Sequence, residues 1–385
     1  MMREILDIFS GIAGDSLGYA RAWKERTGRP VIGSFPMHFP SELAHAAGAL
    51  PVIIQEADEP ITDGEAGVFS FYCGYNRSVV DQAMKGRFDF LDAIMFGDHC
   101  VQLLGTADVV RWNVPDLKIL FNQLISSMNA DWAWEEARGA FAQLRKELDE
   151  LLGTSVTDDA LRASITLFNR NRALIRRLYA LRNTRRLALS ARDMQHVIKS
   201  SMVMDRADHT ALLEQLVALV EGGAVPRSTG MPVYLSGHLC QAPKLELLDM
   251  IEECGTTVVA DDLYHGYRFI ASDVGDAGDP LDALATWYLQ RNRKVPCPTR
   301  VDTEADWVEF LLEAVRETGA QGIIVLLAKF CEPHMYHIPE IKEAFDRAGI
   351  SMLLIETEHD SMPIEAFKTR VETFVEISRR RLVAA

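Results

Sequence analysis

The sequence lacks the features that mark a membrane-spanning, exported or nucleic-acid-binding protein. No apolar run reaches the roughly 20 residues that are needed to cross a bilayer. The first residues include Asp7 and Asp15 instead of a basic segment, an apolar segment and a small-residue cleavage site. We therefore expect a cytoplasmic protein without a membrane partner. The formal net charge of −15 lacks the basic excess that neutralises phosphates, so no nucleic-acid partner is expected.

Nucleotide-binding motifs and paired cysteines are also missing. The chain contains neither a P-loop nor a glycine-rich dinucleotide fingerprint. It has six cysteines and no CxxC pair of the kind found in zinc ribbons. Structural disulfides are not expected in a reducing cytoplasm. The cysteines are therefore candidates for metal binding or catalysis, or they are small buried side chains.

What the sequence does contain is a repeated alternation of β-rich runs and helical patterns. The β-rich runs form two blocks, at 29–35, 50–55, 92–98 and 117–122, and at 231–237, 256–262, 321–328 and 351–356. Segments with helical spacing lie between them, which is typical of βαβ units and a mostly parallel sheet. A chain of 385 residues is long enough for two such units.

The middle of the chain, roughly 130–225, has apolar residues at steps of three and four and is predicted to be helical. Thr157 or Asp158 is a candidate N-cap, and Gly222 and Gly223 close the last helix. We predict an α/β protein with two Rossmann- or flavodoxin-like parallel-sheet lobes joined by a helical segment. The predicted boundaries are 1–130 for the first lobe, 131–228 for the helical segment and 229–385 for the second lobe.

Arginines are concentrated between residues 170 and 186. One interpretation is a solvated helix face whose arginines form salt bridges. The other is a docking surface for an acidic partner or for the phosphates of a CoA ester.

Three cysteines lie at the predicted ends of strands or at the predicted start of a helix. Cys100 and Cys331 come just after predicted strands in different blocks, and Cys73 lies in an aromatic-rich turn that is expected to begin a helix. Ligands of open parallel sheets collect beyond the carboxyl ends of the strands, and a helix N-terminus favours a thiolate. If the lobes face each other, we expect these thiols to converge in the cleft between them.

Spacing alone leaves metal ligation and buried packing both open for these cysteines. A cysteine cluster without nearby histidine suits an iron–sulfur cluster. The intervals of 27 and 231 residues, however, match no compact ferredoxin motif.

The local contexts add a family resemblance. FSFYCGYNRS, FGDHCVQLL and AKFCEPHMYHIPEIK resemble the three cysteine contexts of the benzoyl-CoA reductase and 2-hydroxyacyl-CoA dehydratase family. RPVIGSFPMHFPSELAHAAGALPVII, DDLYHGYR and GISMLLIETEHD resemble further segments of that family, in order along the chain. YLSGHLCQAPKLELLDMIEECGTTVVADDLYHG is most similar to the gamma (C) subunit of benzoyl-CoA reductase. Tyr264 stands where members often have cysteine.

The resemblance implies a cofactor, a set of partners and a reaction. Such subunits bind a 4Fe–4S cluster through three cysteines, here Cys73, Cys100 and Cys331. They pair with a paralogous cluster-binding subunit and receive low-potential electrons from ATP-hydrolysing activating subunits, with reduced ferredoxin upstream. The implied function is the reduction of an aromatic acyl-CoA to a cyclic dienoyl-CoA in anaerobic aromatic degradation. The chain would be inactive without its partner subunits.

Other polar residues are candidates for substrate chemistry. His38, which follows the first strand, is a candidate proton donor. Ser41 and Glu42 are candidates for substrate binding, although capping and first-turn roles in the following helix also explain them. The segment after Cys331 is expected to be a loop stiffened by Pro333 and Pro339, in which His334 or Tyr336 could hydrogen-bond a cluster sulfur.

The remaining cysteines are not among the three ligands that the resemblance implies. Cys240 could be a fourth ligand, a substrate contact or a buried residue, and the last interpretation is favoured. Cys254 and Cys297 are expected to be a packing residue and a loop thiol.

Three alternatives to the reductase remain open. An (R)-2-hydroxyacyl-CoA dehydratase subunit would share the fold and the cluster but recycle its electron. A two-lobed binding protein would close on a small ligand without chemistry. A noncatalytic electron-transfer or scaffolding subunit would assist an active paralogue.

Overall fold

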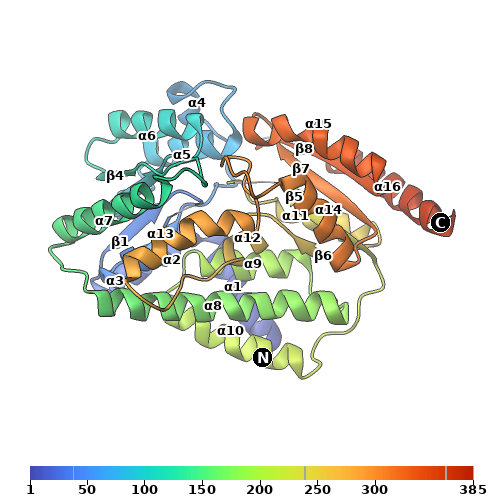
Figure 1. Ribbon diagram of the computed structural model, residues 1–385, viewed down its shortest axis with the longest axis horizontal. Coiled ribbons are helices and arrows are strands. Elements are labelled where there is room, and N and C mark those ends of the chain that lie inside the picture. The colour runs from blue at the N-terminus through green and yellow to red at the C-terminus, as the bar shows by residue number, and fades with distance from the viewer. Residues whose placement is uncertain (38, 238–239, 360–361, 385) are drawn as a thin grey trace.

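The architecture is built on two four-stranded, all-parallel sheets (Figure 1). The computed structural model describes residues 1–384 except 38, 238–239 and 360–361. The first sheet has the order β2-β1-β3-β4, with β1 Val31–Ser34, β2 Leu50–Ile53, β3 Ala93–Gly97 and β4 Ile119–Asn122. The second has the order β6-β5-β7-β8, with β5 Met231–Gly237, β6 Thr256–Asp261, β7 Gly322–Ala328 and β8 Ser351–Thr357. Both orders are flavodoxin-like, so the predicted fold class is confirmed.

Helices cover both faces of the first sheet because neighbouring strand residues point to opposite sides. Val31 belongs to one hydrophobic core and Ile32 to another. The first core packs against α1 Met2–Gly14, α2 Ser16–Thr27, α5 Gly74–Met84, α6 Val101–Asn113, α8 Asp158–Arg185, α9 Ala191–Ser201 and α10 Arg206–Glu221. The second packs against α3 Ser41–Ala46 and α7 Ala133–Leu152.

The second sheet has the same three-layer arrangement. Its two faces are covered by α11 Leu245–Glu253 with α16 Ile364–Ala384, and by α14 Trp307–Thr318 with α15 Glu332–Arg347. Shorter helices are α4 Gly64–Gly67, α12 Tyr267–Ile270 and the 3₁₀ turn Arg291–Arg293.

One helix from the second half of the sequence packs in the first lobe. Helix α13, Pro280–Gln290, contacts α7, and its Leu284 and Tyr288 share a core with Ile32 and Met95 of the first sheet. The chain therefore passes repeatedly between the lobes. The lobe boundaries at 130/131 and 228/229 stay predictions.

The middle segment forms four helices, α7 to α10, and α8 and α10 run along the side of the molecule opposite α4, α6 and α15 (Figure 1). Thr157 is the N-cap of α8, where its side chain accepts a hydrogen bond from the Ala160 amide. The arginines of α8 are used mainly in ion pairs. Arg170, Arg172, Arg176, Arg177 and Arg182 pair with Glu214, Glu42, Asp273, Glu221 and Glu252, respectively.

In the described part of the chain, no helix is both long and apolar enough to cross a membrane.

Gly237, the last residue of β5, leads into the segment that contains Cys240. Its φ is +105°, and a Cβ at this position would lie 1.9 Å from the Leu326 carbonyl oxygen of the adjacent strand. Only glycine fits this conformation and this close approach.

We expect Gly237→Ala to destabilise the protein by roughly 2–6 kcal/mol, because it combines left-handed strain with displacement of β7. Gly278→Ala is the matched control, since its φ is +79° and no atom lies within 4 Å of the added Cβ. That control should cost about 1–2 kcal/mol. Thermal unfolding midpoints compare the two variants, and equal midpoints would contradict the predicted clash.

Candidate functional site

Three cysteines stand at the N-termini of three helices. Cys73 is the N-cap of α5, Cys100 of α6 and Cys331 of α15, and none of these thiols makes a capping hydrogen bond. The predicted helix start at Cys73 is confirmed. Each helix directs its positive N-terminal end toward its cysteine.

These cysteines line one cavity of about 270 Å³ between the two lobes. A fourth cysteine, Cys240, lines the same cavity. The walls come from both halves of the chain and include Tyr75, Gln102, Pro298, Phe330, Pro333 and Tyr336. The structure thus brings together the three cysteines that the sequence singles out, at the carboxyl ends of the sheets.

The electrostatics of this cavity oppose free thiolates. Burial, and then the neighbouring Cys73, raises the pKa of Cys100 to about 12. Burial also raises the pKa of Cys73 and Cys331, and Cys73 raises that of Cys331 further. Burial therefore opposes the thiolate-stabilising effect that a helix N-terminus is expected to have at Cys73, and metal ligation by these thiols stays a prediction. A cationic group in the cavity would lower the pKa of these thiols, because thiolates bind such a group directly.

One side chain connects the three cysteine segments. Gln102, in the first turn of α6 after Cys100, accepts a hydrogen bond from the Cys73 amide at 2.9 Å. Its Nε2 donates to the carbonyl oxygen of Phe330, the residue before Cys331, at 3.0 Å. Phe330 has a φ of +66°, which is strained for a residue other than glycine. The Gln102 amide thus fixes the distance between the lobes at the cavity.

A second amide orients the Cys73 sulfur. Asn76 Nδ2 donates to Cys73 Sγ at 3.2 Å, while Asn76 Oδ1 accepts from the Thr106 hydroxyl at 3.1 Å. The Thr106 hydroxyl also lies 2.9 Å from the Gln102 carbonyl oxygen, and its one proton is shared between these two acceptors. The hydrogen bond from Asn76 stabilises added negative charge on the sulfur.

The segment after Cys331 differs from its predicted conformation. It is the helix α15 and not a loop. Pro333 lies in the first turn, where its missing N–H is not needed, and Pro339 lies inside the helix. Of the two candidate sulfur partners, His334 is buried and stacks on Trp307, whereas Tyr336 lines the cavity and is 83% exposed.

Cys240, for which burial is the favoured interpretation, is half-buried: it packs against the first hydrophobic core and also lines the cavity, so its role stays a prediction. Its Sγ lies 3.5 Å from His99 Nε2. Burial and then Arg300 lower the pKa of His99 to about 3, so this imidazole is neutral. Cys254 and Cys297 are not among the cavity-lining residues.

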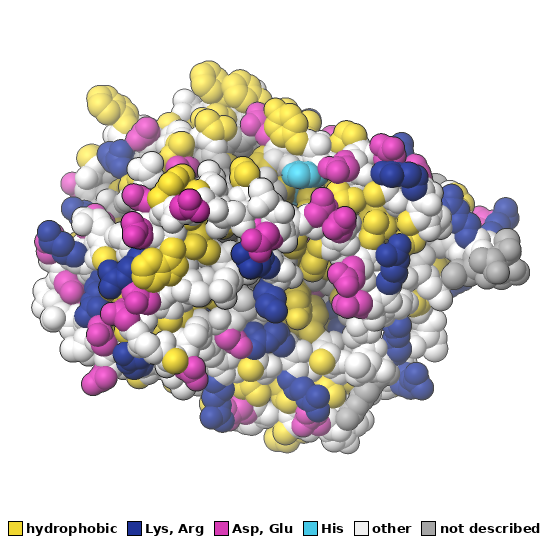
Figure 2. Space-filling model, viewed as in Figure 1, with side chains coloured by type: hydrophobic (Ala, Val, Ile, Leu, Met, Phe, Trp, Pro, Cys, Tyr) yellow, Lys and Arg dark blue, Asp and Glu magenta, His cyan; other side chains and the backbone are white. Residues whose placement is uncertain are grey.

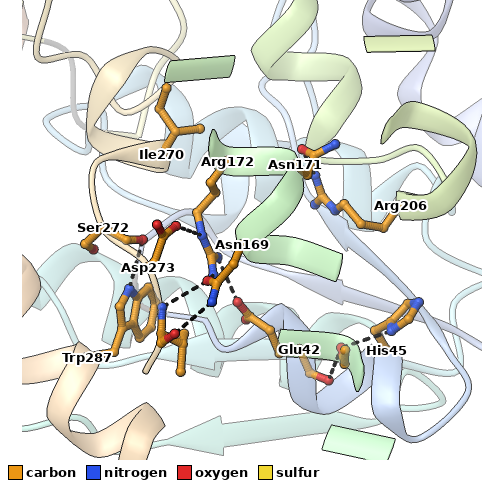
Figure 3. Close-up of polar contacts among 12 residues, drawn as sticks. Glu42, His45, Asn169, Asn171, Arg172, Arg206, Ile270, Ser272, Asp273 and Trp287 are labelled. Atoms are coloured by element: carbon orange, nitrogen blue, oxygen red, sulfur yellow. Dashed lines mark hydrogen bonds and ion pairs between the residues drawn. The ribbon is translucent and has the colours of Figure 1, made fainter. Parts of the chain in front are cut away.

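The candidates for substrate chemistry lie elsewhere or outside the described residues. His38 is one of the residues that the structure does not describe. Ser41 and Glu42 do not line the cysteine cavity, and Glu42 Oε1 accepts a hydrogen bond from Arg172 Nη1 at 2.7 Å (Figure 3). The buried Glu42–Arg172 ion pair joins α3 to α8, and Arg172 also lies 3.5 Å from an oxygen of the exposed Asp273. The substrate roles of these three residues stay predictions.

The family model for the 2-hydroxyglutaryl-CoA dehydratase D-component matches residues 36–377, which is most of the chain. The chain belongs to this family. The matched range includes the four cavity cysteines and all the strands except β1. The predicted family resemblance is confirmed.

Curated relatives in this family are subunits of reductases and dehydratases. The C subunit of the benzoyl-CoA reductase of Thauera aromatica is 27% identical, over 93% of this chain and 93% of its own length. The beta subunit of the lactoyl-CoA dehydratase of Anaerotignum propionicum is 29% identical, over 98% and 99%. The beta subunit of the (R)-phenyllactyl-CoA dehydratase of Clostridium sporogenes is 25% identical, over 96% and 97%.

The donor atoms around the cavity are thiols, which are the ligands that iron–sulfur clusters use. Among the residues that the structure describes, no three His, Cys, Asp or Glu side chains form a group able to hold one metal ion. A four-iron cluster separates its thiolates further than one ion does, because each sulfur binds a different iron. Four thiols around an otherwise largely apolar cavity are a donor set for such a cluster.

The amides of Gln102 and Asn76 were missed by sequence reasoning. The Phe330 partner of Gln102 lies 228 residues away along the chain, so no local pattern indicates it, whereas the contact of Asn76 with Cys73, three residues before it, is a local signal at the helix start.

We expect Gln102→Met to loosen the cavity, because it removes both hydrogen bonds and leaves the Cys73 amide without its acceptor. The expected loss of stability is about 1–3 kcal/mol. Alkylation of Cys73 and Cys331 by iodoacetamide, followed by mass spectrometry, should be faster than in the wild type. Asp108→Asn, on the exposed side of the same helix, is the control. Unchanged alkylation rates in Gln102→Met would contradict the proposed role of the two Gln102 hydrogen bonds in holding the cysteine segments together.

Proposed function

We propose that this chain is a cluster-binding subunit of an acyl-CoA-reducing enzyme of the benzoyl-CoA reductase type. A 4Fe–4S cluster would be held by Cys73, Cys100 and Cys331, and the substrate would be an aromatic acyl-CoA in anaerobic aromatic degradation. The observation that carries this proposal is the meeting of three helix-capping cysteines around one cavity, in a chain of this family.

When bound, such a cluster supplies one-electron transfer at low potential. The chain's own residues would set its environment. Asn76 donates to the Cys73 sulfur, Gln102 fixes the cysteine segments, and the apolar wall of Tyr75, Ala328 and Phe330 limits water. These contacts are already formed before an electron arrives, so the protein around the proposed cluster would need little rearrangement on reduction.

The surface around the cavity supports docking of a paralogous cluster-binding subunit. Large exposed apolar side chains gather on the segments that surround the cavity, along the upper edge of the molecule in Figure 2, where Figure 1 places α4, α6 and α15. They are Phe69, Phe71, Val101, Met335 and Tyr336, and Trp112 at the far end of α6 is also exposed. Phe69 and Phe71 stack on each other, with ring centroids 5.0 Å apart. A rim of this kind is typical of a protein–protein interface.

The family resemblance implies the other partners, which are separate ATP-hydrolysing activating subunits supplied with electrons by reduced ferredoxin. A sequence without a nucleotide-binding motif fits ATP hydrolysis in a different subunit.

A dehydratase subunit is the second candidate, favoured by the 29% identity to the lactoyl-CoA dehydratase beta subunit. A two-lobed binding protein is disfavoured, because packing of α13 in the first lobe opposes hinge closure.

Cys73→Ser, Cys100→Ser and Cys331→Ser should each lower the iron and acid-labile sulfide content of the anaerobically purified chain by at least about half, because each removes one thiolate ligand. Cys254→Ser is the control, since this thiol lies outside the cavity. An iron-free wild type, or equal iron in all four variants, would refute cluster binding by these cysteines.

Reductant consumption separates the two candidate reactions. With its partner subunits and benzoyl-CoA, the complex should consume reductant with every turnover. A dehydratase returns its electron after each cycle, so turnover of a 2-hydroxyacyl-CoA with only catalytic reductant would favour the second candidate. Both substrates should be assayed against the same titrated reductant.

A further inference from the structure

A second cavity, of about 530 Å³, lies beside β4, the edge strand of the first sheet. One wall consists of the end of β4 and the residues that follow it, 121–126, and the other is the face of α7 between Trp132 and Glu147 (Figure 1). We call this cavity the α7 groove. In the described part of the chain it shares no lining residue with the cysteine cavity, so it is a separate site.

The charges that line the α7 groove are all negative. They are the carboxylates of Asp98, Glu136 and Glu147, and no described Lys, Arg or His side chain lines the groove. None of the three carboxylates forms an ion pair with another described residue. Glu147 accepts a hydrogen bond from the neutral amide of Gln143 at 2.9 Å. The α7 groove therefore repels anions, including the phosphates of a CoA ester, and attracts cations.

A buried side-chain amide in the α7 groove lacks a partner. Asn122 is 5% exposed and lines the groove, yet its Nδ2 donates to no acceptor among the residues that the structure describes. Its backbone is paired, because its carbonyl oxygen accepts a hydrogen bond from the Asp98 amide at 3.2 Å. A buried donor without an acceptor costs free energy, which a ligand with an acceptor would recover. Asn122 thus favours a ligand that carries a carbonyl oxygen.

Aromatic rings and free space complete the α7 groove. Trp132 and Phe121 both line it, and they are 52% and 37% exposed. An organic cation is attracted to the face of such rings. Gly139 of α7 leaves the groove open, since a Cβ added there would meet no atom within 4 Å. One ligand could therefore contact carboxylates, aromatic rings and the Asn122 amide.

We propose that the α7 groove binds an organic cation that also carries a carbonyl acceptor, which is the chemistry of an arginine or lysine residue. Glu136 and Glu147 would attract the guanidinium or ammonium group, and Asn122 Nδ2 would donate to the carbonyl oxygen. This site is independent of the cysteine cavity and of the acyl-CoA substrate. The inference thus goes beyond the proposed function and does not rest on it.

The test titrates the full chain, purified anaerobically, with Nα-acetylarginine amide at low ionic strength, and binding is followed by saturation-transfer NMR of the ligand. We expect saturable binding that weakens as salt is added, because salt screens the attraction. Nα-acetylcitrulline amide, which has a similar shape without the charge, should bind at least about tenfold more weakly. Butylguanidinium, which has the charge without the carbonyl, should bind about three- to tenfold more weakly.

Substitutions on α7 locate the binding. Glu136→Gln combined with Glu147→Gln should weaken binding about fivefold, because it removes two charges. Glu150→Gln, on the same helix but outside the groove, is the matched control and should bind like the wild type. Gly139→Leu should fill the groove and abolish binding, while α7 stays folded because leucine favours a helix more than glycine does. Thermal unfolding midpoints check that these variants are folded.

No saturable binding of Nα-acetylarginine amide to the wild type would overturn the proposal. So would binding that is unchanged in Gly139→Leu and in the double glutamine variant, or butylguanidinium binding as tight as that of the amide. The peptide acetyl-Ala-Arg-Ala-amide identifies the source of the cation: tighter binding than the single residue indicates a protein segment, and weaker binding a free molecule. Because these substitutions lie outside the cysteine cavity, the iron and sulfide content of the chain reports separately on the proposed function.

Discussion

The site depends on one geometric constraint, which is that the carboxyl ends of two parallel sheets open into the same space. In each lobe the flavodoxin-like strand order places the central strands side by side, β1 with β3 and β5 with β7. The segments that follow β3, β5 and β7 carry Cys100, Cys240 and Cys331. Cys73 is reached from β2 by the longer connection that contains α4. The strand order therefore brings the cysteine segments to one cavity. The hydrogen bonds of Gln102 and Asn76 then fix the positions of these segments.

The sequence predicts the parts of this arrangement that are encoded locally. Each of the eight predicted β-rich runs overlaps a strand in the described structure, because short β-rich segments between turns differ in composition from the helical segments around them. The N-cap at Thr157 and the helix start at Cys73 are local for the same reason. Both rest on side chains within one turn of the boundary.

The parts that the sequence does not predict depend on long-range contacts. Two prolines suggest a loop after Cys331, yet one of them fits the first turn of a helix and packing retains the other within it. The direction of Cys240 depends on His99 and Glu56, both more than 140 residues away in the chain. Glu42 looks like a helix-start residue near a strand end, and only the structure reveals its buried partner Arg172. In each case the deciding neighbour comes from another segment.

The packing of α13 within the first lobe also bears on how the proposed cluster would receive an electron. Because Leu284 and Tyr288 are buried beside strands of the first sheet, the second half of the chain is anchored to the first by a hydrophobic core. Hinge opening would expose that core, at about 25 cal/mol for each Å² of apolar surface. The walls of the cysteine cavity are thus kept at a nearly constant separation. A charge added inside walls that do not move meets a low reorganisation energy, which favours fast electron transfer over a small driving force.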